Sequence, residues 1–404
     1  MKIAVLGLGQ RGTLYADIVR DKRPDCQIVA VCDTQPYRLS KAKEFYGIPD
    51  EYLFSDEESF FAKGKLADIL FICTMDRAHY RQAVRAVELG YDVLLEKPIS
   101  PTEEECKEIV ATAKKYGRKM AICHVLRYTP FYSEMKTRIA RGDIGRVITV
   151  SQTENVAYWH QAHSFVRGNF RNSQEASPMI LQKCCHDLDI IRWLVDKPCK
   201  SVSSFGSLSY FTGENAPDGA TERCLDCKVD CIYNAPNWYK TARGKDWYVG
   251  KRLGIENIDE GMRVLPHGRC VFKCDNDVVD HQVVNMLFED GATAQLTMTA
   301  FSQETHRTIH IHGTKGEIVG DMEDGYFDVI VFGKGTERFD ITKLGIDLSG
   351  HGGGDIQLVD DFIDYVQEKG DVRTPVDVSL ESHLMAFMAE KSRKSGGQVC
   401  NISV

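Results

Sequence analysis

An apolar strand pattern runs directly into a glycine-rich loop at the N-terminus of this 404-residue chain. Residues 2–6 (KIAVL) have the composition of a buried parallel strand. They precede Gly7-Leu8-Gly9-Gln10-Arg11-Gly12 and the helical pattern of residues 13–21. In a strand–turn–helix unit, such glycines permit a tight turn, close approach of a pyrophosphate and close packing of helix on strand. The N-terminus therefore predicts a dinucleotide-binding site.

A carboxylate follows the second strand at the distance that such a site requires. Residues 27–33 (QIVAVCD) end in Asp33, 21 residues after Gly12. A carboxylate here accepts hydrogen bonds from the adenosine ribose hydroxyls. Asp33 favours NAD as the cofactor, because it would repel the 2′-phosphate of NADP. Arg38 lies close enough in the sequence to leave NADP open as an alternative.

Helical patterns separate three more apolar strands, at residues 67–74, 92–98 and 119–126. This order predicts βαβ units in a doubly wound parallel sheet, a Rossmann domain over residues 1–122. Ligands of such sheets bind beyond the carboxyl ends of the strands. The predicted cofactor-binding residues are Gly7, Gly9, Gln10, Arg11, Gly12, Asp33, Arg38, Thr74, Asp76, His79, Glu96 and Lys97.

The composition, with 43% hydrophobic and 27% charged residues, is that of a globular protein. A length of 404 residues predicts two domains. The net charge of −8 argues against a nucleic-acid surface. No apolar run reaches the ~18 residues of a membrane-spanning helix, and the early glycine loop predicts that no signal peptide is present. We therefore expect a cytoplasmic enzyme that binds neither nucleic acid nor membranes.

The second half of the chain has a strand pattern of period two. Residues 278–301 and 305–322 each contain two such runs, which predicts an antiparallel sheet in an α/β domain of residues 123–404. Residues 157–178 form an aromatic and polar segment that we expect to be a long loop. Loops of this length are commonly functional, so it would line a sugar pocket or cover a subunit contact.

Five segments carry a resemblance to a known family: residues 7–12 (GLGQRG), 32–33 (CD), 72–100, 124–132 (HVLRYTPFY) and 185–194 (CHDLDIIRWL). They resemble the Gfo/Idh/MocA family of NAD(P)-dependent sugar and cyclitol oxidoreductases. The resemblance implies a Rossmann domain joined to an α/β domain with an open, largely antiparallel sheet that supports a dimer or tetramer. It also implies hydride transfer between the nicotinamide and a ring carbon of a sugar, sugar derivative or cyclitol.

The same resemblance implies the catalytic residues. Lys97, in the specific Glu96-Lys97-Pro98 motif, would hydrogen-bond the reacting oxygen and help to move its proton. His186 falls on the histidine of the family's Asp-x-x-x-His motif, and Gln182 replaces the aspartate. A glutamine cannot pass a proton, so Lys97 and His186 would carry more of the acid–base work.

Helical i, i+3 spacing places Asp189 beside His186, where the carboxylate would orient the imidazole. A metal site at Cys184-Cys185-His186 is disfavoured, because neighbouring helical side chains point about 100° apart. The predicted substrate-binding residues are His124, Arg127, Tyr128, His163, Arg167, Gln182, Lys183 and His351.

Two other functions stay open. An NAD-dependent glycoside hydrolase would oxidise a ring carbon transiently, eliminate the leaving group, add water and return the hydride. The Gln182 replacement, the long insertion and the additional histidines suit this reaction. A catalytically silent NAD-sensing protein is the third reading, and the presence of both Lys97 and His186 argues against it.

A cysteine group lies in an insertion, about residues 213–274, outside the family's core pattern. Cys224, Cys227 and Cys231 have a C-x2-C-x3-C spacing, and Cys270 or Cys274 would return as a fourth ligand. Four thiolates of this kind bind structural zinc. An iron–sulfur cluster uses the same ligands, and metal-free thiols are the remaining alternative.

Overall fold

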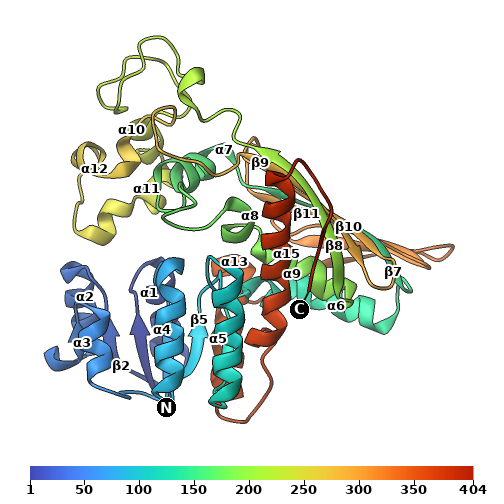
Figure 1. The fold of residues 1–404 in the computed structure, drawn as a ribbon, viewed down its shortest axis with the longest axis horizontal. Helices are drawn as coiled ribbons and strands as arrows, with labels where there is room; N and C mark the ends of the chain where they lie inside the picture. Colours follow the sequence, from blue (N-terminus) through green and yellow to red (C-terminus); the bar gives the residue numbers. More distant parts are fainter. Residues whose placement is uncertain (404) are drawn as a thin grey trace.

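The computed structural model describes residues 1–403 and contains two sheets with their covering helices (Figure 1). The first sheet has six parallel strands in the order β3-β2-β1-β4-β5-β6. These are β1 (Lys2–Leu6), β2 (Gln27–Cys32), β3 (Leu53–Phe54), β4 (Ile69–Ile72), β5 (Asp92–Leu95) and β6 (Met120–Ile122). The intervening helices are α1 (Gln10–Lys22), α2 (Pro36–Tyr46), α3 (Glu57–Ala62), α4 (Asp76–Glu88) and α5 (Glu103–Lys115). The predicted Rossmann sheet is confirmed.

The second sheet has nine strands in the order β14-β13-β12-β11-β7-β10-β9-β8-β15. They are β7 (Val147–Asn155), β8 (Cys199–Ser207), β9 (His281–Phe288), β10 (Thr293–Thr299), β11 (His306–Gly313), β12 (Gly316–Asp321), β13 (Tyr326–Val331), β14 (Gly335–Asp340) and β15 (Cys400–Asn401). Within this second sheet, only β7 and β10 are parallel neighbours among the described strands. The expected open, largely antiparallel sheet is therefore present.

Helices cover one face of this sheet, and the side chains on that face are buried. Along β9, side chains alternate between exposed and buried from His281 to Phe288, as a half-buried strand requires. Helices α9 (Cys185–Val195) and α15 (Val376–Lys394) pack against the buried face, and α6 (Pro130–Arg141) packs on α9. The opposite face carries apolar side chains such as Phe205 and Val319 among polar ones.

The C-terminal segment returns to the Rossmann sheet. Helix α14 (Gly354–Val366) packs against α1. The Ile122 N–H then donates to Thr374 O at 3.0 Å, and Pro375 pairs with Ala121 at the edge of β6. Val376 and two leucines of α15 complete an apolar cluster of the Rossmann half. Residues near the C-terminus thus form part of the hydrophobic core of the N-terminal Rossmann half.

The insertion after β8 contains short helices: α10 (Ala235–Tyr239), α11 (Ala242–Trp247) and α12 (Ile258–Val264). It lies above α1 and α2 in Figure 1. The 3-10 turn Val249–Leu253 packs on α2, and Arg252 Nη1 lies 3.5 Å from Gln10 Oε1 of the glycine loop. The insertion therefore bridges the two halves of the molecule over the cofactor loop.

The expected loop at residues 157–178 is partly helical. Helix α7 (Tyr158–His160) continues into a π-helix, Gln161–Arg167, whose seven side chains are all buried. No glycine or proline interrupts residues 158–167, so burial of these side chains stabilises a helix where polarity suggested a loop. Among the described residues, no helix is long and apolar enough to cross a membrane.

Candidate active site

The loop between β1 and α1 has the shape of a phosphate cradle. Gly7 has φ +85°, and a Cβ there would lie 2.7 Å from Cys73 O. A Cβ at Gly12 would lie 1.9 Å from Gly7 O, so this glycine lets α1 pack closely. A Cβ at Gly9 would meet nothing within 4 Å. The loop is therefore closed on the protein side and open where a pyrophosphate would approach.

Asp33 is held in place at the end of β2. Its Oδ2 accepts a hydrogen bond from Leu8 N at 2.7 Å, and its Oδ1 accepts one from Gln35 N at 2.8 Å. Arg38 Nη1 donates to Oδ2 at 3.2 Å. The carboxylate thus lies beside the glycine loop, where ribose hydroxyls bind in Rossmann domains, and it already neutralises the nearest arginine.

The residues after β4 connect the loops at the carboxyl ends of the strands. The two ring nitrogens of His79 lie 2.8 Å from Pro98 O and 3.2 Å from Thr74 O. Asp76, at the start of α4, accepts a hydrogen bond from Ser177 of the second half. These predicted cofactor residues therefore hold neighbouring loops in register around the crevice.

Arg11 links the glycine loop to both halves. Its Nε donates to Glu96 Oε1 at 2.9 Å, and Tyr15 OH donates to the same oxygen at 2.8 Å. The guanidinium also binds Asp355, which lies 3.1 Å from His351 Nδ1. Burial alone would raise the pKa of Glu96, but the charges of Arg11 and Lys97 hold that pKa below its usual value. Glu96 is therefore anionic beside Lys97.

Lys97 follows β5 and points between the two halves. Its Nζ donates to Gln182 O, at the end of helix α8 (Met179–Gln182), at 2.7 Å. The Lys97-Pro98 peptide bond is cis. The buried Gln182 Oε1 has no hydrogen-bond partner among the described residues. An ammonium and an amide oxygen that is free to bind are thus placed together beyond the strand ends.

Neutral imidazoles surround Lys97. The ring of His186 lies 5.7 Å from that of His124 and 6.4 Å from that of His351. Burial and then the nearby charge of Lys97 lower the pKa of His186 well below its usual value. Burial does the same to the pKa of His124. In the described part of the chain, His186 Nδ1 and both nitrogens of His124 have no hydrogen-bond partner. A neutral imidazole with such an atom can accept a hydrogen bond.

We expect the stability of the protein to fall below about pH 6.5. Burial lowers the pKa values of His124, His186 and His383, the last to about 3. The unfolded chain binds protons at these residues below about pH 6.5, and the folded chain does not. Their contribution is therefore complete above that pH and is lost as pH falls, by about 1.4 kcal/mol per pH unit for each histidine. Urea unfolding between about pH 7 and pH 5 would measure this slope.

Between about pH 7 and pH 5, Asp187 changes the free energy of unfolding in the opposite direction to these histidines. Burial raises its pKa to about 7, so the folded chain keeps a proton that the unfolded chain loses. The pKa values of His306, Glu323 and Asp360 are also raised, but burial lowers the pKa values of four further histidines, so the sign of the slope is unchanged. These four are His160, His163, His267 and His351. His383→Gln should reduce the slope by the contribution of one histidine. A free energy of unfolding that stays constant down to pH 5 would contradict this account.

A buried charge cluster lies beside the imidazoles. Arg307 Nη2 of β11 lies 2.6 Å from Glu154 Oε2 of β7, and Arg307 Nε lies 3.2 Å from Asp187 Oδ1. Lys183 Nζ lies 3.3 Å from Glu154 Oε1. The sequence prediction missed Glu154 and Arg307. The available signal was that Gln152 and Glu154 continue the inward positions of β7, where a charge requires a partner.

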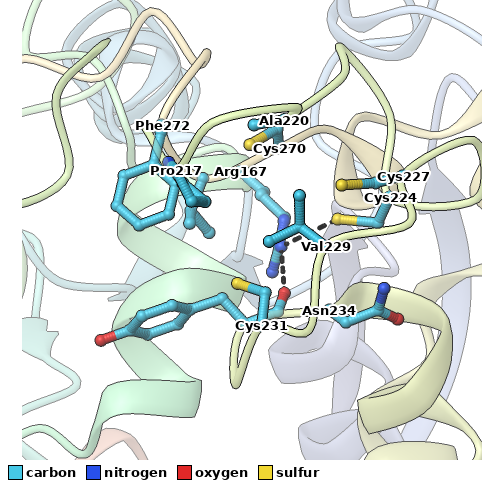
Figure 2. Close-up of a pocket in the computed structure, with 12 residues that line it drawn as sticks. Arg167, Pro217, Ala220, Cys224, Cys227, Val229, Cys231, Asn234, Cys270 and Phe272 are labelled. Carbon is cyan, nitrogen blue, oxygen red and sulfur yellow. Dashed lines mark hydrogen bonds between the residues drawn. The ribbon is translucent and has the colours of Figure 1, made fainter. Parts of the chain in front are cut away.

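Two predicted substrate residues, both on the π-helix Gln161–Arg167, contact the insertion instead. Arg167 projects among cysteines (Figure 2), where its guanidinium donates to Arg269 O at 2.7 Å and to Tyr233 O at 2.5 Å. His163 hydrogen-bonds Tyr239 OH and packs on aromatic rings of the insertion. Neither side chain contacts Lys97 or His186 among the described interactions.

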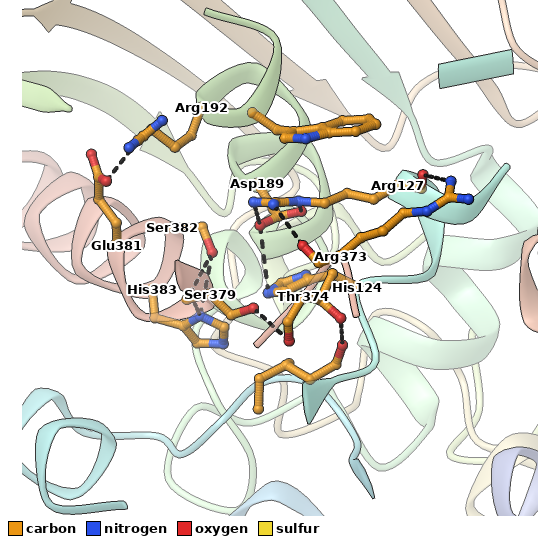
Figure 3. A network of polar contacts seen from close by, with 12 residues as sticks. His124, Arg127, Asp189, Arg192, Arg373, Thr374, Ser379, Glu381, Ser382 and His383 are labelled. Atoms are coloured by element: carbon orange, nitrogen blue, oxygen red, sulfur yellow. Dashed lines mark hydrogen bonds and ion pairs between the residues drawn. The ribbon is translucent and has the colours of Figure 1, made fainter. Parts of the chain in front are cut away.

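Arg127 is engaged in a buried network (Figure 3), and Tyr128 contacts Thr374 of the same network. Arg127 donates to both oxygens of Asp189, at 2.7 and 2.6 Å. Tyr128 OH lies 3.0 Å from Thr374 Oγ1. The expected contact between Asp189 and His186 is wrong, because the fixed fork of Arg127 occupies both carboxylate oxygens. His124 Nε2 lies 4.0 Å from Asp189 Oδ1. Of the predicted substrate residues, the structure places His124, Gln182 and His351 near Lys97 and His186, whereas Lys183 pairs with Glu154.

A Rossmann domain with an open glycine cradle, and a lysine among neutral imidazoles at its mouth, defines a nicotinamide-dinucleotide-dependent oxidoreductase. The family is equally well defined. A model described as "Oxidoreductase family, NAD-binding Rossmann fold" matches residues 1–124, and "Oxidoreductase family, C-terminal alpha/beta domain" matches residues 136–400. The chain belongs to the Gfo/Idh/MocA oxidoreductase family.

Similar proteins include YteT of Bacillus subtilis (strain 168), 23% identical over 359 residues, which are 83% of this chain and 82% of YteT. An inositol 2-dehydrogenase/D-chiro-inositol 3-dehydrogenase of Lactiplantibacillus plantarum is 25% identical over 206 residues, 50% of this chain and 55% of that protein. The scyllo-inositol dehydrogenase of Lactobacillus casei, solved with NAD(H) and scyllo-inositol, has a TM-score of 0.67 at 18% identity over 99% of this chain and 98% of that one. At this identity the structural likeness shows the fold.

Proposed function

We propose that the protein transfers a hydride between the nicotinamide of NAD and a ring carbon of a sugar, sugar derivative or cyclitol. The main support for this proposal is the position of Lys97. Its Nζ lies 2.7 Å from Gln182 O, beyond the end of β5 and near the imidazole of His186. Relatives whose names specify inositol dehydrogenase or D-glucoside 3-dehydrogenase activity support this class of substrate. The matched segments span 55% and 41% of those two relatives.

The chain's own residues divide the work as follows. Bound NAD supplies the hydride acceptor. Lys97 would donate a hydrogen bond to the reacting oxygen, and the neutral His186 would take up the hydroxyl proton as the alcohol is oxidised. Gln182 and His124 would offer other substrate hydroxyls atoms that have no partner among the described residues. Lys183 and His351 would line the remaining sides, with Lys183 held by Glu154 and His351 by Asp355.

The cofactor site is proposed to prefer NAD. Asp33 lies at the ribose position and Arg38 is already paired with it, so a 2′-phosphate would meet a carboxylate. NADP stays the alternative, because a rotated Arg38 would offset part of that repulsion. Residues 1–122 would hold the cofactor, and residues 123–404 would hold the substrate and form the subunit contacts of a homo-oligomer.

A second candidate is glycoside hydrolysis by transient oxidation of a ring carbon. Elimination and water addition need acid–base groups beyond the one that serves hydride transfer. The buried, neutral His124 and His186 supply two such groups. Gln182 in place of a carboxylate also departs from the pattern expected of simple dehydrogenases. In this reaction the hydride returns to the sugar, so the protein consumes no net NAD.

A paired assay on the purified chain decides between the two reactions. It would follow NADH absorbance and free-sugar release over a panel of cyclitols, sugars and glycosides, with NAD and NADP in parallel. We expect stoichiometric NADH with an oxidised sugar or cyclitol, and lower kcat/KM with NADP. Sugar release without net NADH, with solvent deuterium in the product, would establish the glycosidase. If no compound of the panel gives NADH or free sugar, both proposals are contradicted.

A further inference from the structure

Four cysteines of the insertion line one cavity, together with Arg167 (Figure 2). They are Cys224, Cys227, Cys231 and Cys270. Two chain segments meet here, because Cys224 N donates to Gly268 O at 3.0 Å and Cys270 N donates to Glu222 O at 2.9 Å. Cys227 N donates to Cys224 O at 3.3 Å and closes a tight turn. A short antiparallel bridge and a turn thus bring together thiols that are up to 46 residues apart.

One local backbone geometry recurs around these thiols. For three of the cysteines, the N–H two residues later hydrogen-bonds the sulfur: Val229 for Cys227, Tyr233 for Cys231 and Phe272 for Cys270. The repeat of one local geometry at three separate places is the behaviour of metal-binding turns rather than of scattered core thiols.

The cavity also carries a compensating positive charge. Arg167 Nη2 donates to Cys224 Sγ at 3.5 Å, and only 4% of the Arg167 side chain and backbone is exposed. Four thiolates around one divalent cation leave a net charge of about −2, and a buried charge needs a partner. Without thiolates, Arg167 is a buried cation that faces neutral thiols and has no carboxylate among its described partners.

We propose that Cys224, Cys227, Cys231 and Cys270 bind one zinc ion in a closed, structural four-thiolate site. In the described residues, no three of these sulfur atoms lie within 4.8 Å of one another. Binding would therefore draw them inward until each Zn–S distance is about 2.3 Å. The central space of about 20 Å³ holds one ion. Cys274 is outside the set, because it does not line the cavity; its thiol donates to Cys270 O at 3.2 Å.

The ion would join parts of the insertion that have little core of their own. Cys270 belongs to one small apolar cluster, with Phe211 and Phe272, and Cys224 belongs to another, with Tyr239 and Met262. A metal between them clamps the two clusters into one unit. Arg252 of this unit contacts Gln10 of the glycine loop. Zinc binding would therefore help to fix the position of the insertion over the cofactor loop.

The test is metal analysis of the full chain, purified without chelators or a metal-affinity tag. We expect about one zinc per chain by elemental mass spectrometry, released when a mercurial blocks the thiols. Protein produced with Co²⁺ should show the sulfur-to-cobalt charge transfer and intense ligand-field bands of tetrahedral thiolate coordination. Iron with acid-labile sulfide in place of zinc, or a metal-free chain whose thiols are all reduced, would overturn the proposal.

Paired variants locate the ligands. Cys231→Ser should lose the bound zinc, whereas the matched control Cys274→Ser should keep it. If Cys231→Ser does not fold, the cobalt spectrum of the unmodified chain still decides whether four thiolates bind the ion. Retention of zinc in Cys231→Ser, or loss of zinc in Cys274→Ser, would show that the assigned ligand set is wrong.

Discussion

Replacing Lys97 with alanine is expected to lower kcat for hydride transfer by about 10²- to 10⁴-fold, with NAD affinity nearly unchanged. Lys97 is placed by β5 and by its 2.7 Å hydrogen bond to Gln182 O, and it takes no part in the glycine cradle. The substitution therefore removes the proposed donor to the reacting oxygen without altering the phosphate site. Stopped-flow turnover and NAD titration by fluorescence would measure the two quantities separately.

The conservative variant Lys97→Arg separates proton transfer from charge. A guanidinium keeps the positive charge but does not give up its proton in proteins. If Lys97 moves a proton, Lys97→Arg should be nearly as impaired as Lys97→Ala. If only its charge matters, Lys97→Arg should recover much of the rate. Undiminished turnover in Lys97→Ala would contradict the assignment of the active site.

Replacing Arg127 with methionine is expected to lower the free energy of unfolding by about 3–5 kcal/mol. Arg127 and Asp189 form a bidentate pair whose side chains are 3% and 1% exposed. Removal of the cation leaves Asp189 as a buried carboxylate without its main partner, and the remaining protein offers little water to solvate it. Urea unfolding followed by circular dichroism would give the change.

A double substitution tests whether the loss comes from the pair. Arg127→Met with Asp189→Leu removes both charges and should recover much of the stability. The matched control is Arg192→Met, in the Arg192–Glu381 pair, whose side chains are 22% and 9% exposed. We expect a smaller loss there because solvent screens the pair. A small loss in Arg127→Met, with a raised KM instead, would restore Arg127 as a substrate residue.

The parts of the fold that were predictable depend on local sequence. The β1–α1 loop needs only its glycines and its neighbouring strand and helix, so Gly7–Gly12 and Asp33 could be placed from the sequence. The period-two strands β9 to β12 were predictable for the same reason. Lys97 followed from the family resemblance of a short motif after a strand.

The remaining contacts depend on tertiary register. Asp189 lies on the same helix as His186, yet it binds Arg127, which is 62 residues away and comes from another element. Arg307 reaches Glu154 because β11 lies next to β7, a pairing that no local pattern specifies. Arg167 lies among the cysteines because a π-helix replaces the expected loop and turns its side chain toward the insertion.

The return of the C-terminal segment to β6 has a consequence for synthesis of the protein. The ribosome releases the six strands of the Rossmann sheet long before it makes Thr374, Pro375 and helix α15, which cover the edge and part of the core of that sheet. Chains fold from the N-terminus as they emerge. The edge strand β6 of the nascent Rossmann half therefore stays uncovered until the C-terminal segment has been made. A ribosome that stalls before residue 374 therefore leaves an unfinished nucleotide-binding unit, and completion of the last helix also completes the first sheet.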